Sequence, residues 1–132
     1  MSQTSLTIGK LAKQAQVNVE TIRYYQRVGL IKEPEKPNKG FRVYSIDDVS
    51  RIRFIKRAQE LGFTLKEIED LLDLGDGNCA QVQILAEQKL LQINARLNDL
   101  QAMKHAVTDL LEQCKVSEKD IHCVLINSLS DN

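Results

Sequence analysis

The sequence has no tryptophan, two prolines and 5% aromatic residues. It also lacks any apolar run long enough to cross a membrane, and its opening MSQTSLTIGK has no apolar segment followed by a cleavage site. We therefore expect a cytoplasmic chain with no membrane contact. Two prolines and six glycines among 132 residues exclude a collagen-like or linker-like composition. The 42% hydrophobic and 27% charged residues are typical of one folded domain, or of a small domain with an extended element.

Cysteine is scarce, and its count of three is odd. A chain of this length needs no disulfides to fold. Reduced thiols in the cytosol are therefore expected, and a secreted disulfide framework is disfavoured.

The zero net charge hides an uneven distribution along the chain. Residues 1–69 contain 13 Lys and Arg against 8 Asp and Glu, whereas residues 70–132 contain 5 against 10. A basic front half is typical of a protein that binds a polyanion, and an acidic back half would repel one. Chance clustering on solvated helix faces is the alternative.

Residues 7–29 predict two short helices joined by a very short turn. Thr7 is a suitable N-cap for the first helix, which breaks at Gln16 and Val17. Asn18 is a suitable N-cap for the second, which ends at Gly29. The pattern indicates a helix-turn-helix, in which the apolar stripe of the second helix contains Ile22, Tyr25 and Val28.

Residues 30–44 predict a β-hairpin with a basic tip. Two β-favouring segments, 30–31 and 41–44, flank a stretch rich in turn residues. This hairpin would follow the helix-turn-helix as a wing. Its turn residues are Pro34, Pro37, Asn38, Lys39 and Gly40.

Basic and aromatic side chains gather on the second helix and on the returning strand. Arg23 and Arg27 are four residues apart, so they share a helix face that could lie along a groove of DNA. Guanidinium and phenol groups suit contacts to phosphates and base edges. The alternative is that the tyrosines are core residues and the arginines merely solvated. The other members of the group are Tyr24, Tyr25, Arg42 and Tyr44.

Two more helices are expected before the break at residues 75–78. Ser45 is a suitable cap for the first, which extends to Leu61. Thr64 and Glu67 form a capping box that opens the second. A compact DNA-binding head would end there.

From Cys79 to Cys114 the sequence has neither proline nor glycine, and apolar residues recur by heptad. One helix of this length spans about 52 Å. It cannot bury its seam alone, so a partner helix is needed, most simply from a second copy of the chain. A long core helix in a larger monomer is the alternative. The seam residues are Ala86, Leu90, Ile93, Leu97, Leu100, Val107 and Leu111.

The seam predicts an antiparallel pairing of the two helices. In an antiparallel dimer, facing residues have numbers with a constant sum. One such register is apolar throughout. It pairs Val82 with Leu111, Ala86 with Val107, Leu90 with Met103, and Ile93 with Leu100.

The same register brings Cys79 of one chain beside Cys114 of the other. Within one chain these thiols would lie about 52 Å apart, too far to share a metal ion. Cys123 follows Cys114 after an eight-residue loop, and VLINSL predicts a short amphipathic helix that packs this loop. Each dimer would then have two sites, each with Cys79 from one chain and Cys114 and Cys123 from the other.

Three thiolates at such a site favour a soft divalent ion. A closed structural zinc site has four ligands, and no fourth ligand is obvious. Three thiolates around monovalent copper would leave a larger negative charge, so Cu(I) fits less well. A helix N-terminus favours the thiolate form of Cys79. Three inert buried cysteines are the alternative.

No motif predicts an enzyme. His122 lies beside Cys123 without an orienting third group, and His105 is expected on a helix surface. Glu118 or Asp120 could supply an oxygen ligand, although loop acids are usually solvated. No glycine-rich phosphate loop appears.

The segments TIGKLAKQAQVNVETIRYYQRVGLI, FRVYSIDDV and RAQELGFTLKEIEDLL resemble the MerR family of transcriptional regulators, and the similarity continues through LAEQKL to CVLINSL. The three cysteines resemble those of the mercury-responsive branch. The zinc branch has adjacent cysteines and a loop histidine, whereas Lys115 follows Cys114 here, and the copper branch lacks an equivalent of Cys79. One departure is Val124, where proline often follows the last cysteine.

The resemblance implies a mainly α fold: a winged helix-turn-helix head, a long helix forming an antiparallel coiled-coil dimer, and a C-terminal metal-binding loop. The expected parts are a DNA-binding domain at 6–74, a dimerisation helix at 79–114, and a loop with a short helix at 114–132. The implied metal ligands are Cys79, Cys114 and Cys123. The expected DNA-binding residues are Thr21, Arg23, Tyr24, Tyr25, Lys39, Arg42 and Tyr44.

The resemblance also implies how such a protein acts. The homodimer would bind double-stranded operator DNA in a promoter, repress without metal, and distort the DNA when each three-cysteine site holds one Hg(II), so that RNA polymerase opens the promoter. A sensor of Pb(II) or Cd(II) is one alternative. A DNA-binding dimer with redox-sensing cysteines is another.

Overall fold

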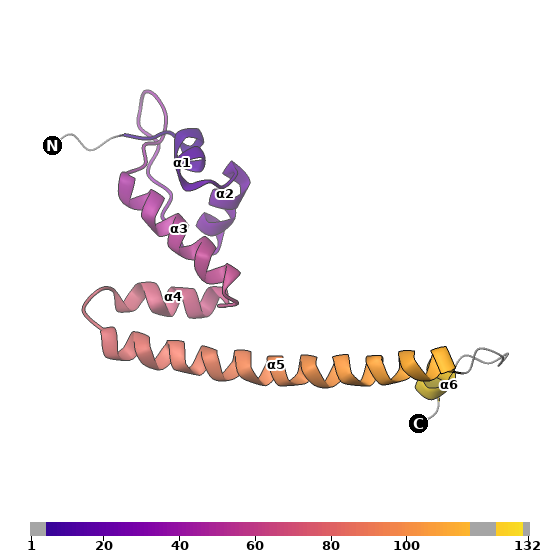
Figure 1. The fold of residues 1–132 in the computed structure, drawn as a ribbon. Helices are drawn as coiled ribbons and strands as arrows, with labels where there is room; N and C mark the ends of the chain where they lie inside the picture. Colours follow the sequence, from indigo (N-terminus) through magenta and orange to yellow (C-terminus); the bar gives the residue numbers. More distant parts are fainter. Residues whose placement is uncertain (1–4, 117–123, 131–132) are drawn as a thin grey trace. The chain divides into compact units, whose positions relative to one another are not determined.

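The structure is a computed structural model, and it describes residues 5–116 and 124–130 of the chain. These residues form six helices: α1 (Ile8–Ala15), α2 (Val19–Arg27), α3 (Ile46–Glu60), α4 (Leu65–Leu74), α5 (Cys79–Val116) and α6 (Val124–Ser130) (Figure 1). The prediction of a mainly α chain is confirmed. The fold divides into two compact units at Val82, within α5, and each is described by itself.

Helices α1 and α2 form the predicted helix-turn-helix. The Thr7 hydroxyl accepts from the backbone N–H of Lys10, and the Asn18 carboxamide oxygen accepts from that of Thr21 at 2.8 Å, so both predicted N-caps are confirmed. Between the helices, Gln16 adopts a left-handed conformation with φ of 60°. The backbone N–H of Gln16 donates to the carbonyl of Lys13, and that of Val17 donates to the carbonyl of Ala12. These two hydrogen bonds close α1 with a Schellman motif.

Helix α2 is terminated by Gly29, as its sequence predicts. It ends at Arg27, followed by Val28 as C-cap and by Gly29 at φ 83°, a conformation that glycine adopts without strain. Val28 was expected on the buried stripe but is 39% exposed, so that prediction was wrong. Ile22 and Tyr25 are buried as predicted.

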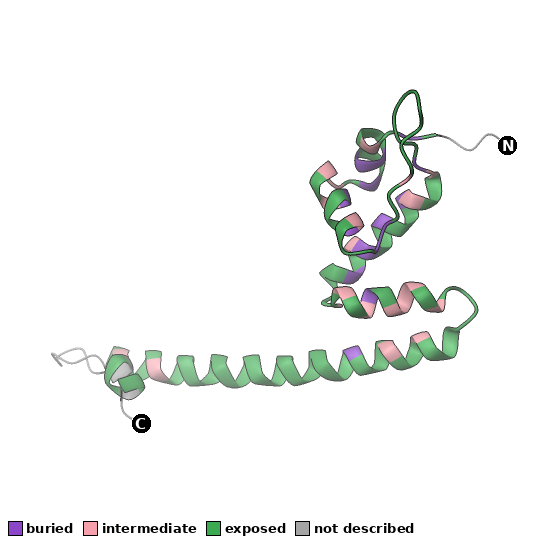
Figure 2. Ribbon diagram, turned by 180° about the vertical axis from the view of Figure 1, so that it is seen from behind, coloured by how far each residue is buried: buried purple, intermediate pink, exposed green. Residues whose placement is uncertain are grey.

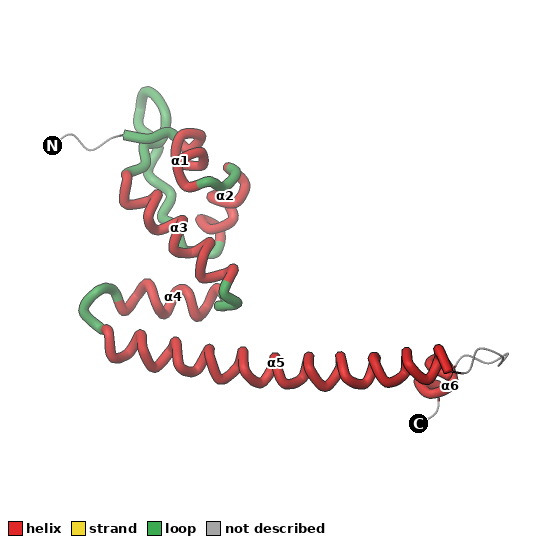
Figure 3. Tube along the Cα trace, viewed as in Figure 1, coloured by secondary structure: helices red, strands yellow, loops and turns green. Residues whose placement is uncertain are grey.

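The predicted β-hairpin is not formed within residues 30–44 (Figure 3). The backbone N–H groups of Leu30 and Ile31 both donate to the carbonyl of Tyr25, so the end of α2 uses the donors that a strand would need. Tyr44 instead exchanges two backbone hydrogen bonds with Leu6, at 3.0 and 2.8 Å, in an isolated antiparallel bridge. The segment is therefore a loop that is anchored at both ends.

Helices α3 and α4 complete the core of the first unit. Ser45 with Asp48 and Thr64 with Glu67 form capping boxes at the start of α3 and α4. Helix α3 packs against both α1 and α4. The largest fully buried side chains of the core are Leu11, Ile22, Leu30, Ile52, Ile55 and Ile68.

Two cations from α3 also bind the end of α1. Arg53 donates to the carbonyl of Gln14 at 2.7 Å, and Lys56 donates to that of Gln16 at 3.0 Å. These carbonyls lack partners within the helix, and positive charge at a helix C-terminus interacts favourably with the helix dipole. Helix α3 therefore fixes the turn of the helix-turn-helix.

Helix α5 is one uninterrupted helix of 38 residues, as its sequence predicts. Nearly all of it is exposed in the single chain (Figure 2). The heptad residues are exposed too: Leu90 is 56% exposed, Leu100 59% and Val107 58%. A continuous apolar seam is therefore left without a partner within the described residues of one chain.

The short helix expected from VLINSL is present as α6. Among the residues that the structure describes, no helix has both the length and the apolar character needed to cross a membrane. The boundaries expected for the three parts of the chain remain predictions.

Candidate nucleic-acid interface and metal ligands

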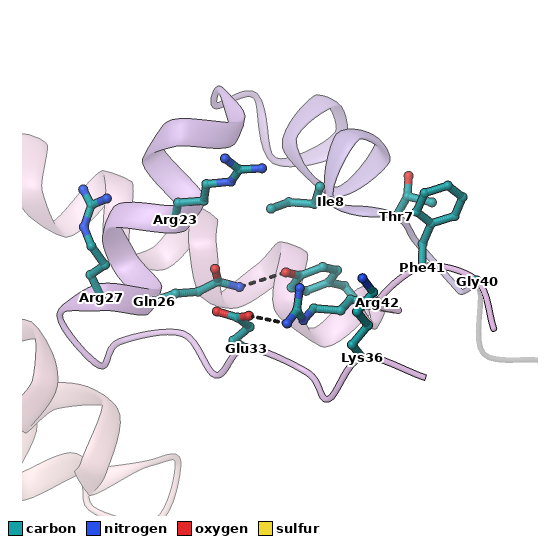
Figure 4. Close-up of a pocket in the computed structure, with 11 residues that line it drawn as sticks. Thr7, Ile8, Arg23, Gln26, Arg27, Glu33, Lys36, Gly40, Phe41 and Arg42 are labelled. Carbon is teal, nitrogen blue, oxygen red and sulfur yellow. Dashed lines mark hydrogen bonds and ion pairs between the residues drawn. The ribbon is translucent and has the colours of Figure 1, made fainter. Parts of the chain in front are cut away.

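An open groove of about 610 Å³ lies between the start of α1, the exposed side of α2 and the loop before α3 (Figure 4). Cationic side chains reach it from both of its walls. A groove with positive charge on two sides suits a polyanion better than a small apolar ligand. Its lining residues are Thr7, Ile8, Arg23, Gln26, Arg27, Glu33, Lys36, Gly40, Phe41, Arg42 and Tyr44.

Helix α2 supplies two arginines to the groove. Arg23 forms a long ion pair with Glu20, 3.6 Å between the nearest atoms, and both side chains are more than half exposed. The guanidinium carbon of Arg27 lies 5.8 Å from the ring centroid of Tyr24, a cation–π arrangement. Both arginines thus lie on a solvent-facing side of α2, as the four-residue spacing predicts.

The loop side of the groove is held in place by Arg42. Its Nε donates to the carbonyl of Pro34 at 3.0 Å, and its Nη2 lies 3.0 Å from a carboxylate oxygen of Glu33. A further bond joins loop and helix, because the Gln26 amide donates to the Tyr44 hydroxyl at 2.8 Å. These side-chain bonds give the loop a defined path without a β-ladder.

Tyr25 and Tyr44 are 2% and 3% exposed and belong to the core. The Tyr25 hydroxyl donates to Gln59 of α3 at 2.7 Å. Burial is the main cause that raises the pKa of Tyr25 above its ordinary value of 10.0, and the nearby Tyr24 and Glu60 raise it further. The hydroxyl therefore stays protonated. Tyr25 therefore ties α2 to α3, and its predicted DNA contact remains a prediction.

The structure gathers part of the predicted DNA-binding set in one place. Arg23, Arg42 and Tyr44 line the groove. Thr21 lies outside it, in a hollow beside Asn18 and Lys56, and donates its hydroxyl to Asn18. The predicted residues Tyr24, Tyr25 and Lys39 are not among those that line the groove.

Five polar or charged residues of the groove were not in the predicted set: Thr7, Gln26, Arg27, Glu33 and Lys36. Lys36 belongs to the same basic loop as Lys39, so the loop's charge could have identified it. Gln26 and Glu33 carry no local signal, because their roles depend on partners 18 and 9 positions away along the chain, Tyr44 and Arg42.

Two of the three predicted metal ligands lie at opposite ends of α5. Cys79 is its exposed first residue, and Cys114 is half-buried near its end. Cys123 lies outside the described residues, as do Glu118, Asp120 and His122. Within the described residues of one chain, no three Cys, His, Asp or Glu side chains are placed to share a metal ion.

His105 pairs with Asp109 at 3.4 Å on the surface of α5, which agrees with the surface role expected for it.

The capped helix pair and the cationic groove beside it define a helix-turn-helix DNA-binding protein. The chain belongs to the MerR family. Residues 6–74 match the family described as MerR HTH family regulatory protein, and residues 49–110 match the one described as MerR, DNA binding. This family consists of DNA-binding regulators, so the predictions of the family and of a regulator rather than an enzyme are confirmed.

Relatives match over almost the whole chain. The mercuric resistance operon regulatory protein of Serratia marcescens is 48% identical over 126 residues, which are 95% of this chain and 88% of that protein. A MerR regulator from Bacillus megaterium, solved with mercury(II), is 38% identical, with a TM-score of 0.70 over 93% of this chain and 97% of its own. A regulator from Ralstonia metallidurans, solved with lead(II), is 32% identical, with a TM-score of 0.80 over 94% of this chain and 98% of its own.

Proposed function

We propose that this chain is a mercury-responsive regulator of a mercury-resistance operon. The observation that carries the proposal is the 48% identity, over 95% of the chain, to a mercuric resistance operon regulatory protein. The donor chemistry supports it, because three cysteine thiolates are soft ligands that suit a thiophilic ion such as Hg(II).

The DNA interface would be the cationic groove with the exposed side of α2. Arg23 and Tyr24 would face a major groove from α2, since a recognition helix uses its exposed residues to reach base edges. Arg42 and Lys39 would contact phosphates from the loop, and Thr21 would do so from the start of α2. Tyr25 is buried, so it would act by fixing α2 against α3, and Tyr44 would act at the edge of the groove.

A homodimer would bury the apolar seam of α5. In the antiparallel register the exposed Leu90, Val107 and Leu111 of the seam would meet apolar residues of the second copy, whereas Leu97 at its centre would meet Arg96. Burying such side chains stabilises the pair by about 25 cal/mol per Å² of apolar surface removed from water. The two DNA-binding heads would then bind two half-sites of one operator.

Each dimer would have two metal sites, one at each end of the paired helices. Cys79 at the start of α5 would meet Cys114 and Cys123 of the second copy. Bound Hg(II) would link the two chains through bonds to three thiolates. Cys79 is the first residue of α5.

The regulatory action we propose is a change in DNA shape. Without metal, the dimer would hold promoter DNA in a form that RNA polymerase cannot open. With Hg(II) bound, it would stay on the DNA and distort it, because deforming the spacer between promoter elements changes how these elements face the polymerase.

A sensor of Pb(II) is the second candidate. The specific observation in its favour is the TM-score of 0.80 to the regulator that was solved with lead(II). Lead(II) also accepts sulfur-rich sites. The lower sequence identity of that relative, 32% against 48%, favours mercury.

A metal titration of a promoter reporter tests the proposed function. In cells carrying this chain and a reporter under a mercury-resistance promoter, Hg(II) should induce at lower concentration than Pb(II), Cd(II), Zn(II) or Cu(I). A Cys114→Ser chain should not respond. Induction by Pb(II) at lower concentration than Hg(II) would favour the second candidate, and loss of the DNA footprint on adding Hg(II) would contradict activation by distortion.

Replacing Arg23 tests the role of α2. Arg23→Ala should weaken operator binding by about 1 to 3 kcal/mol and relax sequence preference, because a forked contact to a base edge is lost. Lys39→Ala should instead lower the salt slope by about one unit, as expected for a phosphate contact. Affinities for operator and scrambled duplexes across a salt series measure both effects. An unchanged operator affinity for Arg23→Ala at every salt concentration would show that α2 does not read the major groove of DNA.

Mixing two defective chains tests the shared metal site. A homodimer of Cys79→Ala or of Cys114→Ala should have two defective sites. The mixed dimer should regain one, because the Cys114→Ala chain donates its Cys79 to the intact Cys114 and Cys123 of the other chain. The measurement is Hg(II) retained by co-refolded, differently tagged chains in the presence of a competing small thiol. A purified heterodimer that retains no more Hg(II) than either homodimer would rule out a site shared between subunits.

A further inference from the structure

The cationic groove contains one acidic side chain among its lining residues, that of Glu33. The other charged residues that line it are Arg23, Arg27, Lys36 and Arg42. Figure 4 shows the Glu33 carboxylate directed at the guanidinium of Arg42, with the dashed line between them. A carboxylate in such a place lowers the positive potential that would attract a DNA phosphate.

The Glu33–Arg42 pair has the geometry of an arginine–phosphate contact. The Arg42 Nη2 lies 3.0 Å from the Glu33 oxygen, a distance at which a guanidinium N–H can donate to an anionic oxygen. Both side chains are about half exposed, 42% for Arg42 and 50% for Glu33. A phosphate could therefore replace the carboxylate without any rearrangement of the core.

Arg42 does not depend on Glu33 alone for its position. Its Nε donates independently to the carbonyl of Pro34 at 3.0 Å, and the loop is also fixed by the bond from Gln26 to Tyr44. If the Glu33 carboxylate is removed, these bonds still hold the guanidinium at the groove. The carboxylate is thus separable from the scaffold that presents Arg42.

We propose that Glu33 is a built-in competitor of DNA phosphate for Arg42 and so limits the affinity of the protein for DNA of any sequence. This role rests on the DNA interface proposed above. A phosphate that binds at the same Nη2 must displace the Glu33 carboxylate from it. Because phosphates carry no sequence information, the penalty applies equally to operator and to other DNA.

Neutralising Glu33 should strengthen DNA binding and make it more sensitive to salt. With Glu33→Gln, Arg42 is available to phosphate, and affinity for a fluorescein-labelled duplex of scrambled sequence should rise about three- to fivefold at low salt. The logarithmic salt slope should steepen by up to about one unit, because Glu33 no longer takes up a cation when Arg42 leaves it. Fluorescence anisotropy across a salt series measures both quantities.

Glu35→Gln is the matched control. It removes the same charge from the same loop, two residues away, but Glu35 does not line the groove. Its effect on affinity should be smaller, and the salt slope should not change. In an Arg42→Ala background, Glu33→Gln should have no larger effect than Glu35→Gln, because the competition needs Arg42.

Three results would overturn the proposal. Equal gains from Glu33→Gln and Glu35→Gln would show that only net charge matters. Weaker DNA binding by Glu33→Gln would show that the carboxylate positions Arg42 for DNA. Both results leave the proposed DNA interface intact. If the unmodified protein fails to bind the duplex even at low salt, the interface itself is wrong, and the role of Glu33 with it.

Discussion

The apolar seam of α5 is the constraint on which the rest of the molecule depends. A helix of 38 residues exposes leucines, isoleucines and valines along its length, and no described part of the same chain covers them. A partner helix would remove this surface from water, and the proposed antiparallel register would do so mostly with apolar pairs. The same pairing would set the separation of the two heads and would bring Cys79 of one chain to Cys114 of the other, so operator spacing and metal chemistry would both follow from one helix.

In the DNA-free head, the exposed side of α2 and the cationic groove are already held in place. Arg53 and Lys56 bind the end of α1, and Tyr25 joins α2 to α3. Arg42 holds the loop through the carbonyl of Pro34. Little ordering of the backbone would then be needed on binding. An effector signal could reach DNA as a movement of rigid heads.

Local signals in the sequence predicted the helices well. Asn18 and the capping box of Thr64 mark helix starts, and the heptad pattern predicts α5 as one helix. The prediction of a hairpin was wrong because the backbone N–H groups of Leu30 and Ile31 donate to a carbonyl of α2. β propensity alone does not reveal these hydrogen bonds. The groove was predicted in part: Arg23 and Arg27 follow from helical spacing, whereas contacts such as that of Gln26 with Tyr44 depend on the tertiary fold.

Disulfide trapping tests the antiparallel dimer most directly. With the native cysteines replaced by serine, one chain would contain Ala86→Cys and a differently tagged chain Val107→Cys. These positions face each other in the antiparallel register, so mild oxidation of the mixture should link the two chains, while either chain alone should stay unlinked. Efficient linking of the Ala86→Cys chain to itself would place equal positions together, as in a parallel pair, and would contradict the account.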